Sequence, residues 1–244
     1  MTFKSIAIVA VLIVAFLVPV DRYQQVSHKW SSDEIASYRQ SVTIIDAIFR
    51  DGSVAESAGV VIGKDGTTLT VAHLFRHGEI DTIIMTVPNG NVYELDILTI
   101  NSRIDLALVR PKAAAPYFKY LPIYRSAIVD PNEDLLVIGH PMWLYNHVEF
   151  GVMLGTYFDI FYGGCISCIS ALVRPGNSGG PVINTHGEVI GIVSASAHDP
   201  VTWQFKYGMA VAISEIHIFL RLAESMKPYW PRQIRRYRLD EVKK

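Results

Sequence analysis

Cysteine is scarce in this sequence, since Cys165 and Cys168 are the only two among 244 residues. This lone C-x-x-C pair lacks the second pair of ligands that a structural zinc site needs. On one extended strand the two Cα atoms would lie about 10 Å apart with side chains on opposite faces, too far apart for a disulfide unless the chain bends at Gly163-Gly164. We therefore expect packing thiols and no metal site.

Charge is also sparse, because charged residues make up 18% of the chain and the net charge is −1. This balance gives no electrostatic case for nucleic acid as a partner. Half of the residues are apolar, which is enough to bury a large core. The charge is uneven, because residues 227–244 carry seven basic and two acidic residues, while the rest of the chain is net acidic. This basic tail suits either a solvated chain end or a contact with an anionic membrane or a partner.

Long apolar runs are missing except at the N-terminus, where residues 6–20 carry no charged or polar side chain. A helix of this length spans about 22 Å, less than the roughly 30 Å of a bilayer core. No A-x-A pattern for signal peptidase follows the run. We favour an uncleaved signal anchor over residues 1–21 with the rest of the chain on the extracytoplasmic side, and a cleaved signal peptide of a secreted protein is the alternative.

Helical periodicity is weak, and the sequence shows no internal repeat. Residues 22–40 read as a linker followed by a short helix capped at Ser32. From residue 41, short apolar runs alternate with turn signals such as Asp51-Gly52 and Asn89-Gly90, which predict hairpins. This pattern indicates an all-β sandwich or pair of barrels. Residues 214–226 form the one other predicted helix, which has apolar residues spaced to pack on the body.

Residues 174–181, RPGNSGGP, place one serine hydroxyl among three glycines. A serine needs a base to accept its proton and donors to hold the oxyanion that forms after attack. The glycines permit a tight bend that can point the backbone N–H groups of Gly176 and Ser178 at one spot. His73 ends a predicted alternating strand, which would hold its imidazole in place, and it is the best candidate base. Asp105 begins the apolar run DLALV and can orient that imidazole.

Four segments together resemble the trypsin-like serine proteases, and the bacterial HtrA/Deg type in particular. They are SAGVVIGKDGTTLTVAH ending at His73, DLALV starting at Asp105, PGNSGGP around Ser178, and VIGIVS over residues 189–194. The resemblance covers residues 41–224 and includes the family's His, Asp, Ser order. It implies two six-stranded antiparallel β-barrels with the active site between them, flanked by the N-terminal hydrophobic helix and the C-terminal helix. A protease domain over residues 41–226 without the PDZ domains of many HtrA proteins is expected.

The resemblance also implies roles for residues. His73 would be general base and acid, Asp105 its partner, Ser178 the nucleophile, and Gly176 and Ser178 the oxyanion donors. The pocket for the residue before the scissile bond would be lined by Leu172, Ser194, Ser196 and Gly208. Because Leu172 replaces the aspartate of trypsin, we expect small or medium apolar residues there. Polypeptides are the implied substrates and no cofactor is implied. The expected role is extracytoplasmic, periplasmic or cell-surface, protein quality control or processing, and the sequence leaves a homo-oligomer open.

Two alternatives remain. Gly176-x-Ser178-x-Gly180 also fits the nucleophile elbow of α/β-hydrolase esterases, although Pro181 follows where that fold needs a helix. The chain could instead be an inactive binding module on a protease fold, since fold does not fix function.

Asn177, which stands where trypsins carry an aspartate, indicates an enzyme that is not activated by a freed N-terminus.

Overall fold

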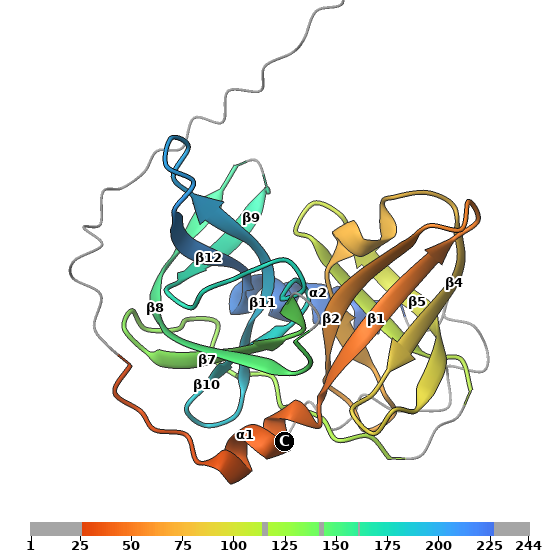
Figure 1. Ribbon diagram of the computed structural model, residues 1–244, viewed down its shortest axis with the longest axis horizontal. Helices are drawn as coiled ribbons and strands as arrows, with labels where there is room; N and C mark the ends of the chain where they lie inside the picture. Colours follow the sequence, from red (N-terminus) through yellow and green to blue (C-terminus); the bar gives the residue numbers. More distant parts are fainter. Residues whose placement is uncertain (1–25, 114–116, 142–143, 161, 227–244) are drawn as a thin grey trace, which may run out of the picture.

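Two closed six-stranded antiparallel barrels lie side by side in the computed structural model, which describes residues 26–113, 117–141, 144–160 and 162–226 (Figure 1). The first barrel runs in the order β1-β2-β3-β6-β5-β4 and the second in the order β10-β11-β12-β9-β8-β7. The strands of the first are β1 (Val42–Phe49), β2 (Val54–Val61), β3 (Thr68–Thr70), β4 (Ile80–Thr86), β5 (Val92–Asn101) and β6 (Leu106–Pro111). Those of the second are β7 (Asp134–Gly139), β8 (His147–Asp159), β9 (Gly164–Ile169), β10 (Pro181–Asn184), β11 (Val189–His198) and β12 (Phe205–Ala212). The predicted all-β barrel pair is confirmed.

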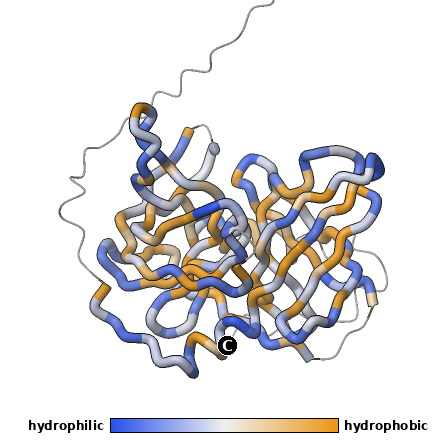
Figure 2. Tube along the Cα trace, viewed as in Figure 1, coloured by the Kyte–Doolittle hydropathy of each residue, from blue (hydrophilic) through white to orange (hydrophobic). Residues whose placement is uncertain are grey.

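Turn chemistry and alternation explain why these strands form. Gly52 and Gly90 have φ values of 84° and 85°, the left-handed conformation that glycine adopts without steric cost. Along β1 the buried and half-buried residues nearly alternate, as a half-covered strand requires. Figure 2 shows hydrophobic segments along the strands of both barrels and hydrophilic ones at many turns.

Each barrel is filled by large apolar side chains with almost no exposed surface. Ile45, Leu69, Met85 and Leu106 fill the first barrel, and Leu136, Ile138 and Met153 fill the second. Closure leaves few open strand edges and fixes the loops that carry polar residues at the junction of the barrels. The rigid interiors therefore hold the polar residues between them in place.

Two α-helices brace the pair of barrels. α1 (Ser32–Arg39) begins after a capping box in which Ser31, one residue before the predicted cap, accepts from the Glu34 N–H. α2 (Ile213–Ser225) buries Ile216 and Phe219 and packs against strands of both barrels, including β5, β6, β11 and β12. In Figure 1 it lies behind the junction. The predicted C-terminal helix is confirmed.

The expected anchor in residues 1–21 and the basic tail in residues 227–244 lie outside the described residues. Within residues 26–226, where the structure describes them, no helix is long and apolar enough to cross a membrane.

Candidate functional site

His73 lies in the short 3-10 helix η2 (Ala72–Phe75), not at the end of a strand as predicted. Strand β3 stops at Thr70, which pairs with Ala107, and the chain then turns so that Ala72 N–H donates to Asp105 O over 3.2 Å. The His73 side chain keeps 39% of its surface exposed. Its ring therefore lies at the barrel junction with one side open to solvent.

Asp105 holds His73 through two hydrogen bonds, one to the imidazole and one to the backbone. Its Oδ2 lies 2.8 Å from His73 Nδ1, and its Oδ1 accepts from the His73 backbone N–H over 2.9 Å. Asp105 has a φ of 59° at the residue just before β6, a strained conformation for a non-glycine residue that aspartate tolerates better than most. With a carboxylate at Nδ1, the proton of the neutral ring belongs on Nδ1, which leaves Nε2 able to accept one.

Ser194 is a second side-chain partner of Asp105, and sequence reasoning assigned it only to the substrate pocket. Its Oγ donates to Asp105 Oδ2 over 2.5 Å. Burial by itself would raise the pKa of Asp105, but the hydrogen bonds from His73 and Ser194 outweigh it and hold that pKa below its usual value. The carboxylate therefore stays charged beside the imidazole.

The Ser178 turn docks the second barrel onto the first. Ser178 O accepts from Ala58 N–H over 2.8 Å, and Gly179 N–H donates to Val193 O over 2.7 Å. A methyl group on Gly179 would lie 2.0 Å from Ala58 O, and the residue has a φ of 84°, so only glycine fits here. Pro181 begins strand β10 rather than a helix, which rules out the α/β-hydrolase elbow.

The backbone N–H groups of Gly176 and Ser178 belong to the turn that carries the Ser178 hydroxyl. Gly176 has a φ of 95° and its carbonyl accepts from His140 N–H over 3.0 Å, which turns that carbonyl toward His140. Among the described residues, neither the Gly176 nor the Ser178 N–H donates to a protein acceptor. Both donors can therefore serve an oxyanion.

The Ser178 hydroxyl itself donates to Ser194 O over a long 3.3 Å. In the described part of the chain no hydrogen bond joins it to His73. Such bonds often form only when substrate is bound. Ser194 is the link, since its carbonyl contacts Ser178 and its hydroxyl contacts Asp105.

Two of the four predicted substrate-pocket residues lie directly opposite each other. Ser196 and Gly208 are cross-strand partners on β11 and β12. Leu172 is half-buried, but its neighbour Val173 packs on Gly208, because a methyl added there would lie 2.5 Å from Val173 Cγ2. Val173 was not predicted, and nothing in its apolar surroundings marks it in the sequence.

A cavity of about 420 Å³ opens beside His73 and Asp105. Its other lining residues, which come from both barrels, are Arg76, Ser102, Arg103, Tyr162, Ser194 and Ala195. Sequence reasoning missed Arg76, Arg103 and Tyr162. Their closeness in sequence to His73 and Asp105 could have indicated the two arginines, whereas Tyr162 carries no such signal.

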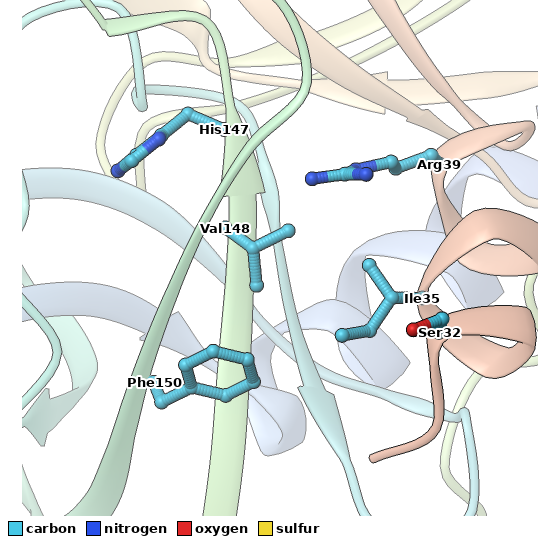
Figure 3. Close-up of a pocket in the computed structure, with 6 residues that line it drawn as sticks. All are labelled: Ser32, Ile35, Arg39, His147, Val148 and Phe150. Carbon is cyan, nitrogen blue, oxygen red and sulfur yellow. The ribbon is translucent and has the colours of Figure 1, made fainter.

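A second cavity, of about 380 Å³, lies between α1 and β8 and contains none of these residues. Figure 3 shows Arg39 and His147 on opposite walls, with Ile35, Val148 and Phe150 below them. Arg39 Nε donates to Asn146 O over 3.0 Å, which ties the helix to the strand entry.

The two cysteines lie on β9 and are both free. Burial raises the pKa of Cys168 to about 11, so this thiol stays protonated at neutral pH. Both side chains are half-buried on this strand, and their role as packing thiols stays a prediction. The described residues contain no group of three His, Cys, Asp or Glu side chains that could hold a metal ion.

Comparison with known proteins places these features in context. The sequence profile of the trypsin-like peptidase domain matches residues 57–192. Serine protease HTRA1B of Danio rerio is 30% identical over 182 residues, which are 72% of this chain and 36% of that protein. A Brucella suis protein named "Probable periplasmic serine endoprotease DegP-like" is 31% identical over 144 residues, which are 58% of this chain and 28% of that protein.

Among solved structures, the HtrA-type protease AlgW with a tripeptide shares the fold, with a TM-score of 0.67 over 79% of this chain and 62% of that chain at 19% identity. The chain spans about a third of the length of the curated relatives that it matches.

Proposed function

We propose that this chain, which belongs to the trypsin-like peptidase family, is a serine endopeptidase that uses Ser178, His73 and Asp105. The observation that carries the proposal is the 2.8 Å contact between His73 Nδ1 and Asp105 Oδ2, at a junction of two barrels that also carries a glycine-bracketed serine. Two relatives of the chain are named as a serine protease and a serine endoprotease, and these names support the same class of reaction.

The proposed reaction begins with attack by Ser178 Oγ on the carbonyl carbon of a peptide bond. His73 Nε2 accepts the hydroxyl proton, and the charged Asp105 stabilises the imidazolium that forms. His73 then gives this proton to the leaving amine as the C–N bond breaks, which leaves an acyl-enzyme on Ser178. Water attacks the ester with His73 again as base, and the serine is restored.

The N–H groups of Gly176 and Ser178 are the proposed oxyanion donors. Each removed donor of this kind typically costs about 10²- to 10³-fold in rate. Before attack, Ser178 Oγ must leave Ser194 O and turn toward His73, since the long 3.3 Å bond occupies it in the structure.

A small apolar residue is the proposed preference before the scissile bond. Val173 packs on Gly208 and so narrows the space beside Ser196. No acidic side chain is among the predicted lining residues Leu172, Ser194, Ser196 and Gly208, so arginine and lysine would find no partner there.

An extracytoplasmic site of action is proposed on two grounds. The apolar run over residues 6–20 suits an export or anchor segment, and one relative is named as periplasmic. The proposed protease domain is residues 41–226, and its proposed role is protein quality control or processing on that side of the membrane.

An inactive binding module is the second candidate, and the absence of a Ser178–His73 hydrogen bond among the described residues favours it. Fluorophosphonate labelling distinguishes the two. We expect the full chain, purified in detergent, to be labelled, and its Ser178→Ala and His73→Ala variants to stay unlabelled. A folded parent that resists labelling would support the binding module instead.

A further inference from the structure

One edge of β11 lies beside the cavity that His73 and Asp105 line, since Ser194 and Ala195 of this strand also line it. On that edge β11 pairs with β10 up to Ile192, and Val193 bonds to Gly179 and Gly180. From Ser194 to Ser196 no described strand pairs with this edge, although β12 continues along the other edge. An extended chain can therefore add here as a strand.

Alternation along such a strand sends successive side chains to opposite faces. If the residue before the scissile bond lies beside Ser196 and Gly208, the side chain of the preceding residue points the other way. That direction is the side of His73 and Ala195, both of which line the 420 Å³ cavity. One substrate side chain therefore reaches this cavity.

Cations dominate the cavity wall. Arg76 Nη2 donates to Ser102 O over 2.5 Å and lies 3.9 Å from Asp105 Oδ1. The side chain of Arg103 lies against Gly163, because a methyl group there would be 2.0 Å from its Nε. No described carboxylate forms an ion pair with Arg103.

The one acidic residue in the wall cannot neutralise both arginines. Asp105 already accepts hydrogen bonds from His73 N, His73 Nδ1 and Ser194 Oγ. Tyr162 adds a half-buried phenol near Ser194. Burial is the main cause that raises the pKa of Tyr162; a hydrogen bond with Ser194 and the Arg76 charge oppose it, and the charges of Asp105 and Asp159 add to it. The phenol therefore stays a neutral donor, and the cavity offers positive charge and donors.

We infer that this cavity is a specificity subsite for an acidic side chain, Asp or Glu, on the substrate residue directly before the one that supplies the scissile carbonyl. The inference rests on the proposed endopeptidase function. Arginine presents paired donors in a geometry that matches a carboxylate, so Arg103 and Arg76 bind the acid while Lys or Arg at the same substrate position is repelled.

Matched peptides test the subsite. Quenched fluorescent peptides carry Ala, Val or Leu before the scissile bond and either Glu or Gln one residue earlier, so that each pair differs only in charge. With the full chain we expect kcat/KM to be about tenfold higher for Glu than for Gln, an advantage that falls as salt is added. In the Arg103→Gln variant, the ratio of kcat/KM for the Glu peptide to that for the Gln peptide should fall to about threefold or less.

Arg50→Gln is the matched control, since Arg50 lies in the same barrel and pairs with Glu79 at the surface. It should keep the parent's Glu/Gln ratio. Arg103→Glu should reverse the preference toward Lys over Glu, which separates charge recognition from a loss of folding.

The outcomes separate this inference from the proposed function. Cleavage of Glu and Gln peptides at equal rates would overturn the acidic subsite and leave the endopeptidase intact. A ratio unchanged in Arg103→Gln would also overturn it. If fluorophosphonate labels Ser178 but no peptide of either series is cleaved, the acidic preference is wrong. If the parent is neither labelled nor active, both proposals fail together.

Discussion

Three hydrogen bonds converge on the carboxylate of Asp105, two of them from His73 and one from Ser194. Its φ of 59° adds strain that the surrounding contacts must hold. The residue therefore serves two purposes, because it orients the imidazole and fixes the turn that carries it.

Asp105→Asn should lower kcat by about 10⁴-fold with the fold retained. Asparagine also tolerates a positive φ, and its carbonyl can still accept from His73 N–H. Its NH₂ group facing Nδ1 would leave the ring proton on Nε2, so His73 could not act as base. Peptide hydrolysis and thermal unfolding measure the two effects, and a rate within about tenfold of the parent would contradict the proposed role.

Val173→Ala should enlarge the space beside Gly208. Because each methylene in such a pocket changes selectivity by about 10- to 200-fold, we expect the kcat/KM ratio for Leu over Ala before the scissile bond to rise by at least about tenfold. Peptides that differ only at this residue measure the ratio.

Val137→Ala provides the control, since Val137 is fully buried in β7. Both variants should lose about 1–2 kcal/mol of stability, but only Val173→Ala should change selectivity. Equal selectivity in the two variants would show that Val173 does not bound the pocket.

At the scale of elements, sequence patterns predicted the strands well and their ends less well. Gly52 and Gly90 mark hairpins because their conformation is local to the turn. The helix η2 around His73 was missed because a contact with Asp105, 32 residues away, ends β3 early. The second role of Ser194 depends on the same kind of distant contact, which no local pattern contains.

Strands β1 and β2 place two carboxylates opposite each other, Asp46 and Glu56. Burial first, and then the Glu56 charge, raises the pKa of Asp46 to about 6 from an ordinary value of 3.8. The pKa of Asp46 is higher in the folded protein than in the unfolded chain. Protonated Asp46 therefore makes its full contribution to stability below about pH 4. This contribution is lost as the pH rises through about 6.

Asp46→Asn should therefore stabilise the protein at pH 7.5 by roughly 1–3 kcal/mol and have little effect near pH 4. Urea unfolding of parent and variant at the two pH values measures the difference. Asp81→Asn, an exposed site on β4, is the control and should change little at either pH. If the variant showed no gain in the free energy of unfolding at pH 7.5, burial and the Glu56 charge would not destabilise the ionised form of Asp46.

At the scale of the whole molecule, the candidate site exists only because the two barrels dock. His73 and Asp105 come from the first barrel, and Ser178 and Ser194 from the second. The cationic cavity is likewise built from both, so its residues carried no joint signal in the sequence. The turn at Gly179 is one point of close contact between the barrels, where Ala58 O and Thr70 Oγ1 leave no room for a side chain.

Gly179→Ala and Gly52→Ala form a matched pair that tests this docking. Both glycines have a φ of 84°, but nothing lies within 4 Å of a methyl group on Gly52. Gly52→Ala should cost only the backbone strain, about 1–2 kcal/mol, and keep full fluorophosphonate labelling. Gly179→Ala adds a backbone clash that neither barrel can relieve without moving apart.

Labelling and peptide cleavage should therefore fall at least about 100-fold in Gly179→Ala, because an error of about 1 Å between base and nucleophile already costs that much. Urea unfolding of both variants shows whether the loss of labelling and cleavage arises in a folded or an unfolded chain. If the barrels move apart, the urea midpoint of Gly179→Ala should fall further below the parent's than that of Gly52→Ala. If Gly179→Ala were labelled at the parent's rate, the contact between Gly179 and Ala58 would not set the position of Ser178.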